Sequence, residues 1–248
     1  MQESIPVGAG EARPLDPGAA SRPAEGGEPL SDPRALQILS TEHWSLLASR
    51  SLAYNEAFSR AGMFLTFLSA SLIVIGFVIG AQGLSTTVVP VALALLLADL
   101  FIGLATVGRL IGANGEEFQT IRGMNRIRHA YREMVPGLEP YFVSSFHDDA
   151  RGVLELYGPV APSSSLAEIL HGLTTTIGMI ATIDAMIVGA ISGIAALGLG
   201  AGVEVAIASA VLGFVAAFAV LTVILMRTAI ASQQFAESLF PSLPEDPA

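Results

Sequence analysis

Two aspartates lie inside long apolar runs and are the residues best placed to do chemistry. Asp99 is the twelfth residue of the run 88–111, and Asp184 is the twelfth residue of the run 173–197. About 20 apolar residues of helix cross the hydrocarbon of a bilayer, so both carboxyls are expected near its midplane. Because an ionisable group at that depth is costly, it marks a candidate ion or proton site.

Two interpretations of these aspartates stay open. In the first, the carboxylates bind a cation, share a proton or line a water-filled pathway, with Thr106, Thr182 and Ser192 nearby. In the second, each carboxyl is protonated or hydrogen-bonded across a helix interface and holds neighbouring helices together. No basic residue shares their expected depth.

Other residues with chemical potential are few. His147, Asp148 and Asp149 follow one another, but with His129 they match no metal-ligand spacing, so a solvated loop is expected there. The chain has no cysteine, which removes disulfides, thiolate ligands and cysteine nucleophiles. Glycine-rich phosphate loops and nucleophile elbows are also absent from the sequence. We therefore expect no enzyme, no cofactor and no metal site.

The composition predicts an all-α, polytopic membrane protein. Of the 248 residues, 52% are hydrophobic and only 14% are charged, and the mean hydropathy is +0.62. Four transmembrane helices are expected, joined by short turns at 82–87 and 198–202 into two antiparallel hairpins. The predicted order is a disordered acidic tail (1–31), an amphipathic juxtamembrane helix (32–60), a first transmembrane hairpin (61–111), a cytosolic helical insert (112–165), a second transmembrane hairpin (166–227) and a cytosolic tail (228–248).

The polar segments are themselves expected to be helical in part. Ser31, Asp32 and Pro33 read as a helix start, and Glu56 can pair with Arg60 four residues later. The helix that follows should lie at the membrane interface or pack on the end of the bundle. In the insert, a basic helix is expected at 116–135 and a short helix at 143–157, and a capping box at 163–168 should open the third crossing.

Aromatic and basic residues near the ends of the crossings are candidate membrane-interface residues. The basic helix around Arg126 either binds anionic lipid or packs on the bundle, with its arginines pairing with Glu116, Glu117 and Glu133. A net charge of −10 disfavours nucleic acid as a partner. The interface candidates are Trp44, Tyr54, Arg60, Arg109, Arg122, Arg126, Arg128, Arg132 and Arg227.

The arginines also predict the topology. All 12 basic residues are arginines, and none lies in the turns 82–87 and 198–202. The positive-inside rule then places both termini in the cytoplasm. No secretory signal pattern opens the chain, so the first crossing should act as the insertion signal.

The segment 36–72 reads LQILSTEHWSLLASRSLAYNEAFSRAGMFLTFLSASL. Its EHWSLL and N-E-x-F-x-R-x-G-M-F-L patterns resemble the N-terminal part of a family of uncharacterised actinobacterial four-helix integral membrane proteins. The resemblance implies a multi-pass protein of a bacterial inner (plasma) membrane with no assigned role, and it carries over no catalytic residue.

Two functions from different classes follow. The first is a small channel or transporter-like bundle that uses Asp99 and Asp184. The second is a non-transporting membrane scaffold whose cytosolic helices recruit a partner, with the aspartates holding helices together. Small residues four apart, at Gly76/Gly80, Gly189/Gly193 and Ser209/Gly213, allow close helix approach and are compatible with a homo-oligomer in the lipid bilayer.

Overall fold

The computed structural model describes residues 29–83, 85, 87–157, 172, 174–234 and 237–242, and within them the chain is all-helical, without a strand. The long helices are α1 (Ala35–Gln82), α2 (Val88–Met134), α5 (Thr176–Gly198) and α6 (Val203–Gln234). Between α2 and α5 lie the short helix α3 (Ala150–Leu154) and the single turns Glu139–Tyr141 and Glu155–Tyr157. Each of the four long helices contains an apolar stretch long enough to cross a membrane.

The first two helices are longer than the sequence division suggests. The segments 32–60 and 61–83 join in one helix of 48 residues, and 88–111 joins the basic helix in one of 47 residues. No proline interrupts the interior of either helix. Pro33 and Pro136 lie outside the two helices, and Pro90 lies in the first turn of α2, where proline is tolerated. At about 1.5 Å per residue each is about 70 Å long, more than twice the roughly 30 Å of bilayer hydrocarbon.

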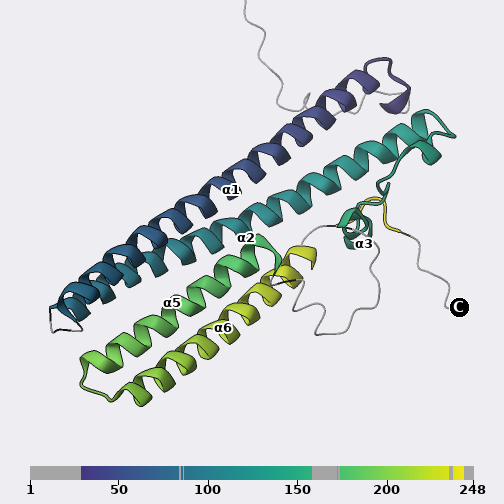
Figure 1. Ribbon diagram of the computed structural model, residues 1–248. Helices are drawn as coiled ribbons and strands as arrows, with labels where there is room; N and C mark the ends of the chain where they lie inside the picture. The colour runs from purple at the N-terminus through teal and green to yellow at the C-terminus, as the bar shows by residue number, and fades with distance from the viewer. Residues whose placement is uncertain are drawn as a thin grey trace, which may run out of the picture.

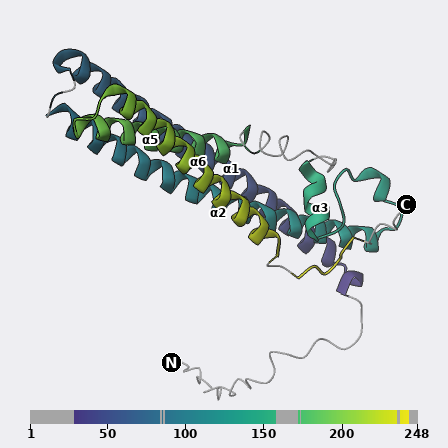
Figure 2. The same cartoon turned by 90° about the horizontal axis from the view of Figure 1, so that it is seen from below.

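Helices α1 and α2 lie side by side and run in opposite directions (Figure 1). Arg50 of α1 contacts Glu117 near one end of the pair, and Ser71 contacts Asp99 nearer the other. We call residues 35–60 of α1 and 112–134 of α2 the stalk. Helices α5 and α6 lie beside the apolar part of the pair, and the stalk extends beyond them, as Figures 1 and 2 both show.

Glycines set the closest helix approaches. A Cβ at Gly189 of α5 would lie 2.8 Å from the Ala210 carbonyl oxygen of α6, and one at Gly213 would lie 2.5 Å from Ser192 Oγ. These residues belong to the predicted small-residue pairs. A Cβ added at Gly76 or Gly80, in contrast, would have no neighbouring atom within 4 Å among the residues described.

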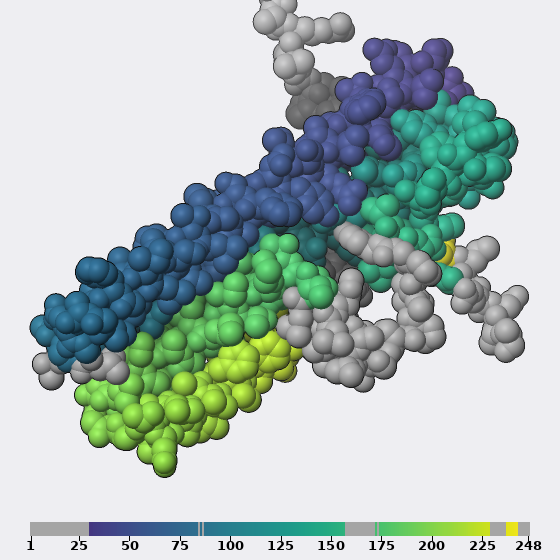
Figure 3. All heavy atoms as spheres, viewed as in Figure 1, coloured from purple at the N-terminus to yellow at the C-terminus, as the bar shows by residue number. Residues whose placement is uncertain are grey.

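The apolar core lies where α1, α2 and α5 meet. It includes Phe64, Leu96, Val107 and Ile180, which are all almost fully buried. Helix α6 is the outermost element and packs mainly on α5, as the space-filling view in Figure 3 shows. Among its described side chains only Ala206 is buried, while large apolar residues such as Leu212 are exposed. Such an outer surface suits lipid.

Several helix ends differ from the predictions. Asp32 accepts a hydrogen bond from the Arg34 backbone N–H and pairs with its guanidinium. Helix α1 begins at Ala35, without a side-chain cap. Of the helix expected at 143–157, only the part from Ala150 onward is helical. Helix α5 begins at Thr176 and is capped by the Thr175 hydroxyl. The predicted capping box at 163–168 and most of the predicted acidic tail, 1–28, lie outside the described residues.

Candidate functional site: a buried carboxyl pair

Asp99 on α2 and Asp184 on α5 are both completely buried, with 0% of each residue exposed. Asp99 Oδ1 accepts a hydrogen bond from Ser71 Oγ of α1, at 3.1 Å. The other oxygen of Asp99 and both oxygens of Asp184 have no hydrogen-bond partner in the described part of the chain. Three of the four carboxyl oxygens are therefore buried and unpaired there.

The Asp184 carboxyl packs against Gly103 of α2, at a point where α2 and α5 touch. A Cβ at this position would lie 1.8 Å from Asp184 Oδ1 and 2.9 Å from the Phe64 ring, so only glycine leaves room for the carboxyl. Gly103 is one turn beyond Asp99 on the same buried stripe of α2. Four residues of helix rise about 6 Å, so the two aspartates differ in depth by about one turn.

The hydroxyls expected near the aspartates bond elsewhere. Thr106, Thr182 and Ser192 each donate to the carbonyl four residues earlier in their own helix. Ser71 takes their place beside Asp99. Sequence spacing did not indicate Ser71, because its position opposite Asp99 depends on the register between α1 and α2.

This arrangement can hold a proton or a cation. An unpaired polar atom in a buried site costs about 1–3 kcal/mol, and a carboxylate costs more. A protonated carboxyl or a bound cation lowers that cost, and a carboxyl that changes between these states is what an ion or proton site needs. No group of three or more acidic or histidine side chains suited to a metal occurs among the residues described.

Charged residues gather where the apolar part of α1 and α2 meets the stalk. Glu56 bonds Arg109 at 2.9 Å and also Arg60 at 2.9 Å, so the predicted Glu56–Arg60 pair is confirmed. The Arg109 and Arg60 guanidiniums lower the pKa of Glu56 to about 2. Arg109 also contacts Glu116. The candidates Trp44 and Arg227 are exposed.

Beside these charges lies a pocket of about 210 Å³ between α1, α2 and the start of α5. Arg50 and Glu117 pair across its wall at 2.8 Å, and Tyr54 Oη donates to the same Glu117 oxygen at 2.9 Å. The rest of the lining is largely apolar and includes Leu110 and Ile177. Neither Asp99 nor Asp184 lines it.

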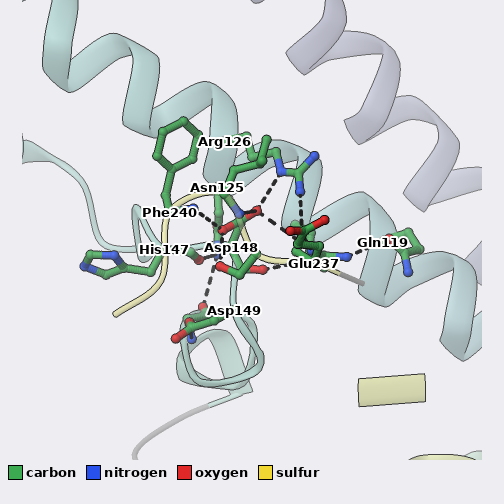
Figure 4. Close-up of polar contacts among 12 residues, drawn as sticks. Gln119, Asn125, Arg126, His147, Asp148, Asp149, Glu237 and Phe240 are labelled. Atoms are coloured by element: carbon green, nitrogen blue, oxygen red, sulfur yellow. Dashed lines mark hydrogen bonds and ion pairs between the residues drawn. The ribbon is translucent and has the colours of Figure 1, made fainter. Parts of the chain in front are cut away.

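A second polar site lies at the far end of the stalk, where the sequence predicted a solvated loop (Figure 4). That prediction was wrong for Asp148, which is completely buried and held by Arg126 at 2.7 Å. The loop folds back on α2, where Asn125 Nδ2 donates to the carbonyls of His147 and Gly152. The burial of Asp148 depends on contacts between segments that are far apart in the sequence. The pattern of neighbouring residues does not reveal such contacts.

The arginines of the basic helix are engaged within the protein. Arg122, Arg126, Arg128 and Arg132 contact, in order, Asp148, Asp148, Asn125 and Glu139. Arg122 and Arg126 therefore contact Asp148 instead of the predicted partners Glu116, Glu117 and Glu133. Binding of anionic lipid by this helix stays a prediction.

Comparison with known proteins finds no matching family model and no match among curated proteins or solved structures. The resemblance of the segment 36–72 to actinobacterial membrane proteins therefore stays a prediction. What can be concluded about function comes from the geometry of this chain: an all-helical protein with four helices able to cross a membrane and a pair of buried carboxyls between them.

Proposed function

We propose that the chain is a multi-pass protein of a bacterial inner membrane, with two transmembrane hairpins and both termini in the cytoplasm. Four sufficiently long apolar helices support this proposal, as does the absence of arginine from the turns 82–87 and 198–202. In this arrangement the stalk projects into the cytoplasm, and Asp99 and Asp184 lie within the bilayer.

We propose further that Asp99 and Asp184 form a proton- or cation-binding site in a small channel or transporter-like bundle. The observation that carries this is the completely buried Asp184 carboxyl, which has no partner among the described residues and rests on Gly103 one turn from Asp99. Intramembrane carboxyls are rare and usually functional. If Asp184 only held helices together, it should bond a neighbouring hydroxyl or carbonyl, as Asp99 bonds Ser71.

Flux measurements in liposomes test the proposal. Purified protein is reconstituted, and the entry of H⁺, Na⁺ and K⁺ is followed with fluorescent indicators. The variants Asp99→Asn and Asp184→Asn keep side-chain size but remove the titratable group, and each should abolish the flux of the wild type. Glu204→Gln, in the first turn of α6, removes an exposed acid and should leave flux unchanged. Flux no higher than in empty liposomes, or flux unchanged in both aspartate variants, would contradict the proposal.

The alternative is a membrane scaffold, and the surface of the stalk favours it. Trp44, Leu52 and Phe58 of α1 are 69%, 70% and 69% exposed, so these large apolar side chains are free to contact another molecule. In a scaffold, these residues would contact a soluble partner. The wild type would show no flux, and the variants Asp99→Asn and Asp184→Asn would change only the stability of the protein. Absence of flux in the wild type, with an intact and folded preparation, would favour this alternative.

A further inference from the structure

The last described residues of the chain contact α2 and the loop before α3. We call residues 237–242 the strap, and we call Arg122, Arg126, His129, Asp148 and Asp149 the cradle. The strap follows α6, whereas the cradle is built from α2 and the loop before α3, so the two are about 90 or more residues apart in sequence. Figure 4 shows Asp148 at the centre of these contacts, with Glu237 and Phe240 on the strap.

Asp148 binds the middle of the strap mainly by contacting the backbone of the strap residues. Its carboxylate accepts hydrogen bonds from Ser238 Oγ at 2.6 Å, from the Leu239 N–H at 3.1 Å and from the Phe240 N–H at 2.7 Å. The Asp148 N–H donates in return to the Phe240 carbonyl at 3.2 Å. The side chain and the backbone of Asp148 thus both bind backbone groups of the strap.

The other cradle residues hold the two ends of the strap. At one end, Arg122 and Arg126 donate to the Glu237 carbonyl at 2.8 and 3.2 Å. At the other, Asp149 accepts hydrogen bonds from the Ser242 N–H, at 3.0 Å, and from the Ser242 hydroxyl.

An aromatic contact adds to the polar ones. The His129 ring stacks on the Phe240 ring, with the two centroids 3.8 Å apart. Contacts thus run along the whole strap.

The negative charge of Asp148 in the cradle is stabilised by hydrogen-bond donors of the strap. Burial alone would raise the pKa of Asp148, but the hydrogen bonds from Ser238, Leu239, Phe240 and Arg126 hold it well below its usual range. The carboxylate is therefore ionised at neutral pH and requires the donors that the strap supplies. Release of the strap would remove three of these donors from the carboxylate and leave water to replace them.

We propose that the cradle is a peptide-binding site whose ligand is the strap of the same chain, and that this contact fastens the end of α6 to the stalk. Helix α6 ends at Gln234 and the strap begins at Glu237. The three steps of chain from one residue to the other span at most about 11 Å, so a bound strap confines that end of α6. Elsewhere α6 packs mainly on α5 and not on the stalk. Release of the strap should therefore let the end of α6 move relative to α1 and α2.

Distance measurements between spin labels on the full chain, reconstituted in lipid nanodiscs, test both parts of the proposal. The chain has no native cysteine, so labels can be placed at will. Labels at Leu239, which is 60% exposed, and at Val143, which is fully exposed, report whether the strap is bound. Labels at Ser59 of α1 and Met226 of α6, both exposed, report the position of α6.

The first expected result is a single narrow distance distribution between Leu239 and Val143. Asp148→Ala should abolish the narrow peak. The double variant Ser238→Ala/Phe240→Ala should also abolish it, and because it changes only the strap, it leaves the cradle residues in place. Glu139→Gln removes an acid from the same loop region that touches Arg132 and not the strap, and it should change nothing. Strap release in either case should broaden the Ser59–Met226 distribution.

Three results would overturn the proposal. A narrow Leu239–Val143 peak that survives in both disrupting variants would show that the cradle does not hold the strap. A Ser59–Met226 distribution that stays narrow after strap release would show that the strap does not restrain α6. A peak that appears between singly labelled chains mixed in one nanodisc would show that the strap binds the cradle of a second copy.

Discussion

The contact between Gly103 and Asp184 gives the sharpest prediction about packing inside the helix bundle. In Gly103→Ala the new methyl group would lie 1.8 Å from Asp184 Oδ1 and 2.7 Å from its Cγ, so α2 and α5 must separate or the carboxyl must move. Overpacking of this kind costs about 1–3 kcal/mol. A Cβ at Gly108, on the same helix, has no neighbour within 4 Å among the described residues, and Gly108→Ala should gain about 0.5–1 kcal/mol because alanine favours helix.

Thermal unfolding of the purified protein in detergent compares the two variants directly. We expect the melting temperature of Gly103→Ala to fall, and that of Gly108→Ala to rise slightly, with a difference on the order of 5 °C between them. In Gly103→Ala/Asp184→Ala the space is restored, so the double variant should lose less stability than the sum of the two single changes. If Gly103→Ala behaved like Gly108→Ala, the close contact between α2 and α5 would be refuted.

Three further predictions concern other polar contacts. Ser71→Ala removes the described partner of the buried Asp99 and should cost about 1 kcal/mol in detergent denaturation; an unchanged midpoint would contradict the contact. Asn125→Leu removes two hydrogen bonds to loop carbonyls and should speed hydrogen exchange in that loop without affecting α5, whereas unchanged exchange would contradict it. Arg109 and Arg60 lower the pKa of Glu56 from 4.5 to about 2. The contribution of the ionised Glu56 to the stability of the fold is therefore fully present above pH 4.5 and is lost as the pH falls toward 2. The melting temperature of Glu56→Gln should therefore lie below that of the wild type at pH 6 and meet it near pH 2, and a difference that vanished already at pH 4 would contradict the pairing.

The sequence allowed the long apolar helices and the placement of Asp99 and Asp184 within them to be predicted, because both depend on local composition. It also indicated that the basic helix would end near residue 135, and α2 does end at Met134. The continuity of α1 was missed because residues 35–60 are polar and residues 61–82 are apolar, and a change in composition suggests a boundary that the backbone does not have. Helix geometry needs only the absence of a breaking residue.

The polar contacts were harder to predict, because they depend on register and on distant segments. Ser71 meets Asp99 only through the pairing of α1 with α2. Asp148 is buried only because the loop and the strap close over α2. A short acidic sequence such as His147–Asp149 is typical of solvated loops. Its neighbouring residues do not reveal that a segment about 90 residues later in the chain covers it.

In the proposed arrangement, four helices cross a membrane and place Asp99 and Asp184 inside it, with the stalk on the cytoplasmic side. Single cysteines at Leu199, between α5 and α6 and 90% exposed, and at Val143, beyond the stalk, test it in intact cells with a thiol reagent that does not cross membranes. We expect Leu199→Cys to be labelled from outside and Val143→Cys to be labelled only after the cells are lysed. Labelling of both positions from the same side, or recovery of the chain in the soluble fraction, would contradict it.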